Sequence, residues 1–364
     1  MKRIFLIISI FILIGTITYV FWMFFSNTSS PSTETTYEFL KEVSAIRKEK
    51  NLPKLQEETD VGSLFGYAIN NGKLYYVDLL GNLKSSVSQN VIKENLSEIH
   101  SFSPNGKYIL LSSGYPFETK YQLFDVAKNE FASLPAGIFS VTWDPASQKI
   151  AYLRKINDTS EIGTFSLSNK RGTRIIGLNV ADGEISWPTK NEIYIADRPS
   201  VASPSSLWRL NLTTLSLTNI AKNETGLLVG WDLDGKNALK FSVSGPKIFF
   251  TLVDKNNKLI WDFSTSGFIT FPGKCAFGVN KIYCAVPKSI NKSWILPDDY
   301  LKGKFFSEDT LYEIDLSTLS SGLPIIKPIY FGLEKIDAIE LKMTENKLHF
   351  INRYDQKLYS VETP

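Results

Sequence analysis

The sequence contains few of the side chains on which metal binding and acid–base catalysis usually depend. Its 364 residues include two histidines, His100 and His349, which lie far apart in the chain. A histidine metal site or a histidine general base is therefore not indicated. The Gly-x-Ser-x-Gly elbow, the His-Glu-x-x-His motif and the P-loop are also missing. From the sequence we predict no catalytic residue, no metal ion and no cofactor.

Clusters of basic residues are scarce as well. The 40 Lys and Arg residues and the 37 Asp and Glu residues give a formal net charge of +3 and are scattered along the chain. No basic cluster occurs outside the N-terminus, which argues against nucleic acid as a partner. The hydrophobic content of 43% and aromatic content of 13% are enough for a sizeable core and argue against disorder.

One long hydrophobic run stands at the N-terminus, from Ile4 to Phe25, with no charged residue. Its length suits a helix that spans a bilayer, and Lys2 and Arg3 before it place the N-terminus in the cytoplasm. A cleaved signal peptide and a buried core helix are the alternatives. The run is longer than a usual signal sequence, and neither an Ala-x-Ala-like site nor a lipid-accepting cysteine follows it. We predict a tail at 1–3, an uncleaved anchor at 4–25, a linker with a short amphipathic helix at 26–62, and a domain outside the cytoplasm at 63–364.

A repeated unit dominates the rest of the sequence. Each unit opens with a strand that ends in a tight turn, and an alternating apolar strand follows. Such units recur every ~40–45 residues, as in propeller blades. We predict an all-β domain, a β-propeller of about seven four-stranded blades, with six or eight blades left open and a β-sandwich as the rival. Blades are expected to start near residues 64, 97, 139, 183, 227, 267 and 335. Segments with a common third-strand pattern are Leu74–Leu79, Leu207–Leu212 and Leu311–Leu316.

The turn Phe102-Ser-Pro-Asn-Gly-Lys-Tyr108 resembles the turn of TolB-like and WD40-like propeller repeats, and Trp143-Asp-Pro145 is similar to it. The resemblance covers residues 97 to 245 well and the rest loosely. The WD40 Gly-His and Trp-Asp signatures are missing, which favours the TolB-like type. That resemblance implies a domain that binds proteins or ligands and has no chemistry of its own. Ring closure is left open: the first unit reads as second to fourth strands, and Ala338 to Thr363 reads as first to third.

The long connections are predicted between second and third strands, and they therefore share one face of the ring. They are Gly114–Lys120, Lys155–Glu161, Asp197–Ser206 and Lys288–Thr310. Loops on a rigid scaffold often carry binding residues. The segment Asn291–Phe306 is the strongest candidate, although its apolar residues could instead pack on the blade below. Adjacent carboxylates on a loop are expected to be solvated rather than to act as an acid–base pair. The candidate binding residues are Tyr115, Phe117, Asp158, Arg198, Trp294, Asp298, Asp299 and Tyr300.

Cys275 and Cys284 flank a predicted hairpin whose two-residue turn is Val279-Asn280. This register places them opposite one another, with Cα atoms about 4.5 Å apart. Outside the cytoplasm we expect them to form a disulfide. The alternative is two small buried hydrophobic residues. Asp232–Asn237 resembles the start of a calcium loop, but its position in the repeat predicts a turn.

These features together predict a function class. We predict a non-enzymatic, membrane-anchored extracytoplasmic module that binds a protein or a glycan at the cell envelope. An accessory subunit of a secretion or pilus assembly is one alternative. A glycan hydrolase or lyase is a weaker one, because the sequence offers no catalytic group for it.

Overall fold

The computed structural model describes residues 54–58, 61–115, 117–330, 332 and 334–363. The chain divides into two compact units, Met1–Leu52 and Pro53–Pro364, and every described residue belongs to the second. The predicted tail, the anchor at 4–25 and most of the linker at 26–62 lie outside the described residues and stay predictions. Within the described ranges, no helix is long and apolar enough to cross a membrane.

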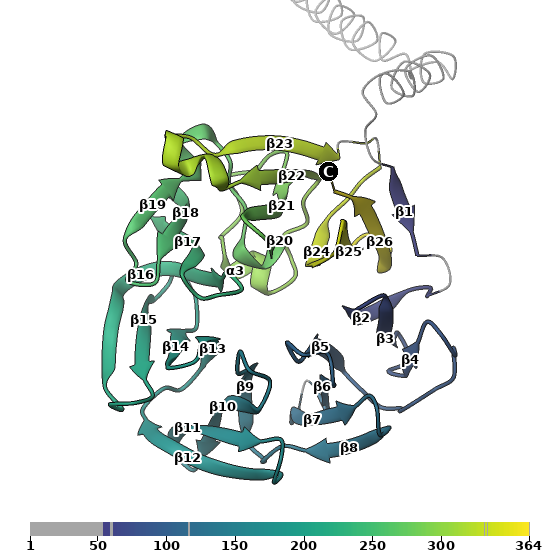
Figure 1. Ribbon diagram of the computed structural model, residues 1–364. Helices are drawn as coiled ribbons and strands as arrows, with labels where there is room; N and C mark the ends of the chain where they lie inside the picture. The colour runs from purple at the N-terminus through teal and green to yellow at the C-terminus, as the bar shows by residue number, and fades with distance from the viewer. Residues whose placement is uncertain (1–53, 59–60, 116, 331, 333, 364) are drawn as a thin grey trace, which may run out of the picture. The chain divides into compact units, whose positions relative to one another are not determined.

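The described residues form a ring of small antiparallel sheets (Figure 1). One sheet has seven strands because a single long strand, β16 (Leu217–Trp231), serves two blades. Its first part pairs with the strand before it as far as Thr225, and its last part pairs with the strand after it, at Thr225 and then from Leu228 onward. Divided there, the described residues form seven blades, which confirms the predicted number.

The strands follow one another outward within each blade, and the first strand lies nearest the centre (Figure 1). Blade 1 contains β2 (Leu64–Asn70), β3 (Lys73–Asp78) and β4 (Leu83–Ser85). Blade 2 contains β5 (Glu98–Phe102), β6 (Tyr108–Ser113), β7 (Lys120–Asp125) and β8 (Glu130–Ser133). Blade 3 contains β9 (Ile138–Trp143), β10 (Lys149–Ile156), β11 (Thr159–Ser166) and β12 (Arg171–Leu178).

The remaining blades complete the ring. Blade 4 contains β13 (Gly183–Thr189), β14 (Glu192–Asp197), β15 (Pro204–Asn211) and the first part of β16, and blade 5 contains the rest of β16, β17 (Asn237–Ser244), β18 (Lys247–Asp254) and β19 (Leu259–Asp262). Blade 6 contains β20 (Cys275–Gly278), β21 (Lys281–Pro287), β22 (Asp309–Asp315) and β23 (Ile325–Tyr330). Blade 7 contains β24 (Ala338–Thr344), β25 (Lys347–Asn352), β26 (Lys357–Glu362) and β1 (Leu55–Glu57). Short helices are η1 (Phe263–Ser266), η2 (Pro272–Lys274), η3 (Ser317–Ser321) and α3 (Asp298–Leu301).

Strand periodicity explains how the blades pack. Side chains on a strand alternate between its two faces, so one strand can contribute to two cores. On β10, Ile150 and Tyr152 pack toward blade 2, whereas Ala151 and Leu153 pack toward blade 4. Seven hydrophobic clusters of this kind join neighbouring blades around the ring. No blade could bury both faces alone, and the ring therefore stabilises every sheet.

The ring closes through the N-terminal strand. β1 adds to the outer edge of blade 7, where Leu55 pairs with Val361 and Glu57 pairs with Tyr359. Blade 1 keeps three strands and, beyond them, a single bridge between Leu83 and Lys93. The predicted strand order of the first unit is therefore wrong, since Leu74–Leu79 is the second strand of its blade and not the third. The apolar patterns of the three short strands are similar, so the sequence alone does not show their order within the blade. The order depends on whether β1 belongs to this blade or to blade 7.

Polar side chains hold the turns that carry the repeat motif. Ser103 Oγ accepts a hydrogen bond from the Tyr108 N–H at 3.0 Å, and Gly106 has a φ of 68° that favours glycine. In the corresponding turn of blade 3, the Asp144 carboxylate accepts the N–H groups of Gln148 and Lys149 at 2.6 and 2.8 Å. Asp232 accepts backbone N–H groups in the same way in blade 5. The prediction that Asp232–Asn237 is a turn is confirmed.

One predicted long loop is wrong. Lys155–Glu161 is mostly strand, because β10 and β11 continue to a two-residue turn at Asn157-Asp158. Arg154 pairs with Glu161 across the two strands at 2.6 Å, and Glu161 is buried. Glu161, one of the charged residues of this segment, is thus accommodated in the sheet by a cross-strand ion pair.

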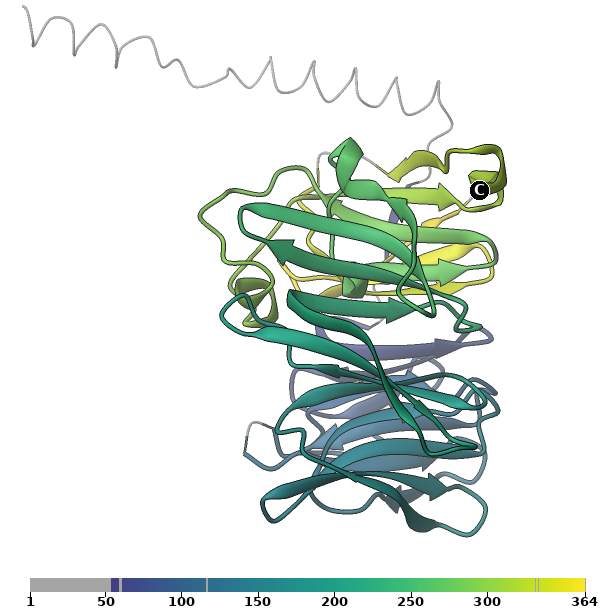
Figure 2. The ribbon, with the colours of Figure 1, turned by 90° about the vertical axis from the view of Figure 1, so that its left-hand side faces the viewer.

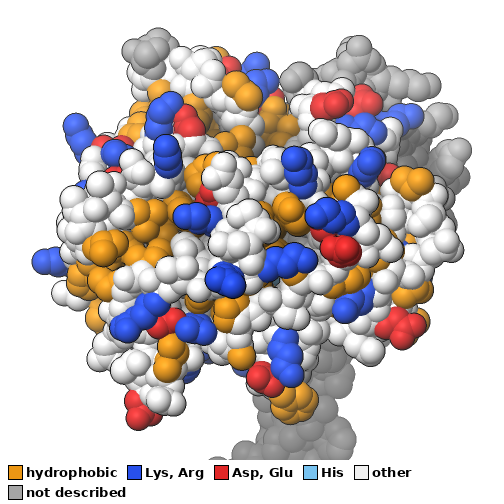
Figure 3. Space-filling model, turned by 60° about the horizontal axis from the view of Figure 1, so that its bottom comes forward, with side chains coloured by type: hydrophobic (Ala, Val, Ile, Leu, Met, Phe, Trp, Pro, Cys, Tyr) orange, Lys and Arg blue, Asp and Glu red, His pale blue; other side chains and the backbone are white. Residues whose placement is uncertain are grey.

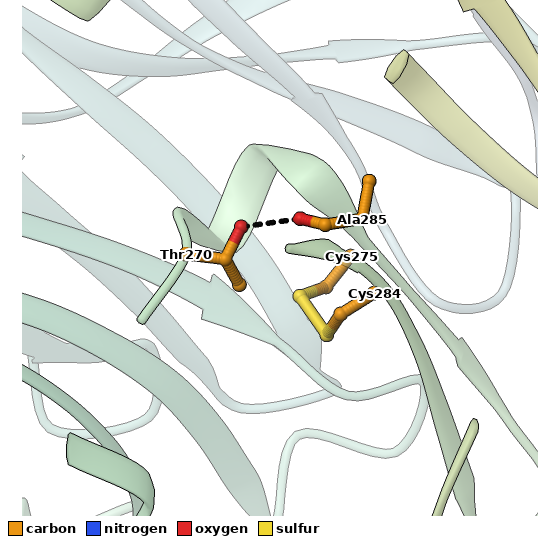
Figure 4. The surroundings of a disulfide bond; sticks show 4 residues. All are labelled: Thr270, Cys275, Cys284 and Ala285. Atoms are coloured by element: carbon orange, nitrogen blue, oxygen red, sulfur yellow. Dashed lines mark hydrogen bonds between the residues drawn. A yellow bond between two sulfur atoms is a disulfide. The ribbon is translucent and has the colours of Figure 1, made fainter. Parts of the chain in front are cut away.

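The predicted disulfide is confirmed. Cys275 and Cys284 pair directly across the β20–β21 hairpin, with Cα atoms 4.1 Å apart (Figure 4). Beside them the Thr270 hydroxyl donates to the Ala285 carbonyl, which fixes the chain entering the blade (Figure 4). Cys284 is fully buried within the cluster between blades 5 and 6.

Loss of this disulfide should destabilise the domain moderately. Closing a loop with a sequence separation of 9 residues restricts the unfolded chain by about 2–3 kcal/mol, an upper value here because the hairpin itself holds the pair. A reductant should lower the denaturation midpoint of the wild type and leave that of Cys275→Ala/Cys284→Ala unchanged. An equal response of both proteins would contradict the prediction.

Candidate functional site

The two faces of the ring differ in their connections. First–second and third–fourth turns lie on one face, here called the turn face, and second–third connections lie on the other, called the loop face. Figure 2 shows the ring edge-on, with the connections of the two faces extending to opposite sides. All eight candidate binding residues belong to second–third connections and thus lie on the loop face. They do not form one cluster, because their loops belong to blades 2, 3, 4 and 6.

The longest connection of the loop face is the β21–β22 loop, residues 288–308. Its interior is apolar: Leu296 and Phe305 are 4% and 2% exposed and belong to the cluster between blades 5 and 6. Tyr300 stacks on Phe271 with ring centroids 3.9 Å apart and planes at 4°. Trp294 meets Phe305 edge-on at 5.7 Å. The packing interpretation therefore holds for Leu296, Tyr300 and Phe305, and the loop is a folded part of the domain.

The two aspartates of this loop are structural. Asp298 accepts hydrogen bonds from Ser200 Oγ at 2.9 Å and from the Val201 N–H at 3.0 Å, both in the β14–β15 connection of blade 4. Asp299 accepts the Ile295 N–H at 2.8 Å within the loop itself. Each carboxylate thus accepts a backbone N–H while its residue stays partly exposed. They also do not form an acid–base pair.

A buried ion network, made of Lys274, Asp309, Asp337 and Arg353, anchors the end of the loop. The Lys274 ammonium has no exposed surface and lies 2.8 Å from Asp309 Oδ2 and 2.6 Å from Asp337 Oδ1. Arg353 Nη1 lies 3.3 Å from Asp337 Oδ2 and donates to the Phe305 carbonyl. Burial raises the pKa of Asp309, and the adjacent Lys274 opposes that shift. Two cations balance two carboxylates, so the network is neutral and joins η2, the loop and blade 7.

The outer surface of the loop face is rich in exposed hydrophobic side chains. Phe117 is 96% exposed and Tyr115 is 75% exposed on the β6–β7 connection. Arg198, in contrast, forms an ion pair with Asp182 at 2.9 Å, and Asp158 occupies a tight turn. Exposed apolar groups on several loops make this face the candidate for binding. The large exposed hydrophobic residues of this face are Leu79, Leu80, Tyr115, Phe117, Ile156, Trp294, Ile295, Leu301, Phe306 and Tyr354.

Titratable groups also gather on the innermost strands of blades 1, 2 and 7. On β5, His100 Nε2 lies 3.0 Å from Ser112 Oγ, and its Nδ1 lies 3.5 Å from Glu98. Burial lowers the pKa of His100 to about 4, with a further contribution from the Lys342 ammonium. Burial raises the pKa of Glu98 and of Glu340. The described residues contain no group of three or more His, Cys, Asp or Glu side chains placed to hold a metal ion.

Sequence reasoning missed the buried ion network. Its members come from four separate segments, and a pattern of alternating residues cannot show which charges meet across blades. Lys274 gave a weak signal, since it is one charge in the apolar stretch from Phe268 to Phe277. The inner-strand group with His100 was missed for the same reason.

Comparison with known proteins shows the fold alone. No family model and no curated protein matches the sequence. Among solved structures, an oligogalacturonate lyase in complex with manganese has a TM-score of 0.52 at 11% identity, over 80% of this chain and 83% of that chain. An acylaminoacyl peptidase from Pyrococcus horikoshii has a TM-score of 0.53 at 12% identity, over 81% of this chain, which spans about half (49%) of the peptidase. TolB from Acinetobacter baumannii has a TM-score of 0.43 at 10% identity, over 92% of this chain and 71% of that chain.

The similar structures include enzymes as well as TolB. At these identities the likeness is of architecture, and it selects neither a reaction nor a ligand.

Proposed function

We propose that this chain is a membrane-anchored, extracytoplasmic scaffold that binds a protein partner at the cell envelope and has no catalytic activity of its own. The observation that carries the proposal is the set of exposed hydrophobic side chains spread over several connections of the loop face. A broad apolar surface of this kind suits a protein partner better than a glycan, because aromatic and aliphatic anchors dominate protein interfaces. An accessory place in a secretion or pilus assembly is one form that this function could take.

Contacts within the domain hold the main connection of the loop face in place without a partner. Asp298 fixes the β21–β22 loop to blade 4, and the Arg353 guanidinium holds the Phe305 carbonyl from blade 7. Side chains such as Trp294 and Ile295 are thus presented on an ordered loop. A preorganised surface loses less conformational entropy on binding, which favours affinity.

The test is site-specific photocrosslinking of the full-length chain in its native envelope. A photoreactive residue at Phe117 or Ile295 should crosslink to the same discrete partner, whereas one at Val87 or Leu259, which are also exposed but lie at the outer edge of their blades, should not. With the photoreactive residue moved to Tyr115, which is 75% exposed, Phe117→Ser/Ile295→Ser should reduce recovery of the crosslinked partner roughly tenfold or more, as loss of interface anchors does. Val87→Ser/Leu259→Ser is the matched control.

The folded state should survive both pairs of substitutions, because exposed side chains contribute within about 0.5 kcal/mol to stability. Equal crosslinking from the loop face and from the blade edges would overturn the proposal, and so would a glycan as the only captured molecule. Deletion of residues 291–306 would not serve as a test, since it also removes the buried Leu296 and Phe305.

A further inference from the structure

The turn face carries one lysine at the first–second turn of every blade. Each of these turns is short and leads directly into the second strand, so the lysine has the same place in every blade. The seven lysines therefore encircle the centre of the ring on a single face. They are Lys73, Lys107, Lys149, Lys190, Lys236, Lys281 and Lys347.

The lysines of consecutive blades 1 to 4 are exposed and form no ion pair within the described part of the chain; they are Lys73, Lys107, Lys149 and Lys190. Those of blades 5 and 6 are paired with carboxylates. Two acidic residues near the first group lie beneath the turns: Asp144 is 7% exposed and accepts turn N–H groups, and Asp125 accepts turn N–H groups in blade 2. Glu130 is exposed at the third–fourth turn of blade 2 and lies 4.0 Å from the Lys170 ammonium. The four unpaired lysines therefore leave an excess of positive charge over blades 1 to 4.

Exposed hydrophobic tips continue this surface over blades 4 to 6. Leu233 is 76% exposed and Val279 is 87% exposed, each at a first–second turn. Leu215 and Leu323, at third–fourth connections, are 49% and 67% exposed. Figure 3 looks mainly at the outer edge of the blades at the bottom of Figure 1, where Lys and Arg side chains are also spread over the surface with fewer acidic ones between them. Basic residues beside projecting apolar tips suit the headgroup layer of an anionic membrane.

The direction of β1 places the entry of the chain on this same face. β26 runs from the loop face toward the turn face, and β1 is antiparallel to it, with Leu55 opposite Val361. The Thr363 N–H binds the carbonyl of Asn346, in the first–second turn of blade 7. Leu55 therefore lies at the turn face. In the sequence, residues 26–53 connect this point to the hydrophobic run at 4–25.

Resting on the membrane anchor proposed above, we infer that the turn face docks on the anionic headgroup surface of that membrane. The lysines of blades 1 to 4 meet phosphate groups, and the apolar tips of blades 4 to 6 enter the headgroup layer. This docking concerns the face opposite the proposed partner site and leaves the loop face directed away from the lipid. Each lysine near such a surface favours the docked state about fivefold, so four together favour it by up to about 600-fold, and salt reduces this factor.

The experiment uses the full-length chain in nanodiscs of phosphatidylcholine alone or with about 30% phosphatidylglycerol. A fluorophore at Ala146→Cys reports on the turn face, a fluorophore at Ser293→Cys reports on the loop face, and a quencher is placed on the lipid headgroups. Quenching is expected at position 146 in anionic discs, and not at position 293 or in neutral discs. About 0.5 M salt should abolish it by screening.

Matched charge variants complete the test. Lys73→Gln/Lys107→Gln/Lys149→Gln/Lys190→Gln should lose the quenching at position 146, whereas Lys288→Gln/Lys292→Gln/Lys302→Gln/Lys304→Gln on the loop face should retain it. Equal loss in both variants, or quenching at position 293, would overturn the inference. Incorporation of the chain into neutral discs measures the anchor separately, so failure of the anchor and failure of docking can be distinguished.

Discussion

Replacement of Lys274 by methionine is expected to lower the free energy of unfolding by about 3–5 kcal/mol. The methionine side chain fills a similar volume, but it leaves Asp309 and Asp337 buried with only the Arg353 guanidinium nearby. An unpaired carboxylate in a site without solvent is the costly element, since its desolvation is no longer compensated. Chemical denaturation of the oxidised protein at neutral pH measures the change.

Two controls separate this effect from ordinary loss of a lysine. Lys335→Met breaks the ion pair between Lys335 and Glu308, in which the two side chains are 60% and 47% exposed. This substitution should lower the free energy of unfolding by less than about 1 kcal/mol. The double variant Lys274→Met/Asp309→Asn restores charge balance and should be more stable than Lys274→Met alone. If Lys274→Met costs no more than Lys335→Met, the buried ion network is not the anchor described above.

The same network connects stability to the proposed site. Lys274 belongs to η2, Asp309 begins β22 directly after the β21–β22 loop, and Arg353 follows β25. The loop is therefore fixed at its C-terminal end by blade 7 and near its middle, through Asp298, by blade 4. A loop held at two distant blades can present exposed side chains in one geometry, which the proposed binding function needs.

Local patterns in the sequence were sufficient for much of the fold. Alternating apolar residues gave the strands, and the recurring turn gave blade starts close to those observed, with the largest deviation in blade 6. There η1 and η2 precede β20, which begins at Cys275 rather than near residue 267. The disulfide could be predicted because hairpin register depends on a two-residue turn alone.

Features that depend on distant residues could not be predicted. The partner of β1 lies about 300 residues away, so the order of strands in blade 1 was misread. The Asp298 contacts with Ser200 and Val201 likewise cross two blades. The exposed residues of the candidate site were located on the correct face because connection order determines the face. How close these residues lie to one another depends on packing between blades, which the periodicity of the sequence does not show.

Between about pH 7 and pH 5, the domain is expected to lose about 2 kcal/mol of stability that His100→Gln does not lose. The pKa of His100 is lowered from 6.5 to about 4 by burial and then by Lys342. Below pH 6.5 the unfolded chain takes up a proton at this position while the folded chain does not. The contribution of His100 is thus fully present above pH 6.5 and falls as the pH drops toward 4.

Comparison of wild type and variant isolates this contribution from its neighbours. Burial raises the pKa values of Glu98 and Glu340, so these groups take up protons more readily in the folded chain than in the unfolded chain. Their contribution to the stability of the domain therefore rises as the pH falls, opposite to that of His100. Of the other titratable groups around the imidazole, burial lowers the pKa of Lys342 and raises the pKa of Tyr121, and both groups are unchanged in the comparison of wild type and variant. Glutamine preserves a polar contact with Ser112 and removes the titration. Parallel stability curves for the two proteins between pH 7 and pH 5 would show that His100 is solvated in the folded state, and that the centre of the ring is open to water at blade 2.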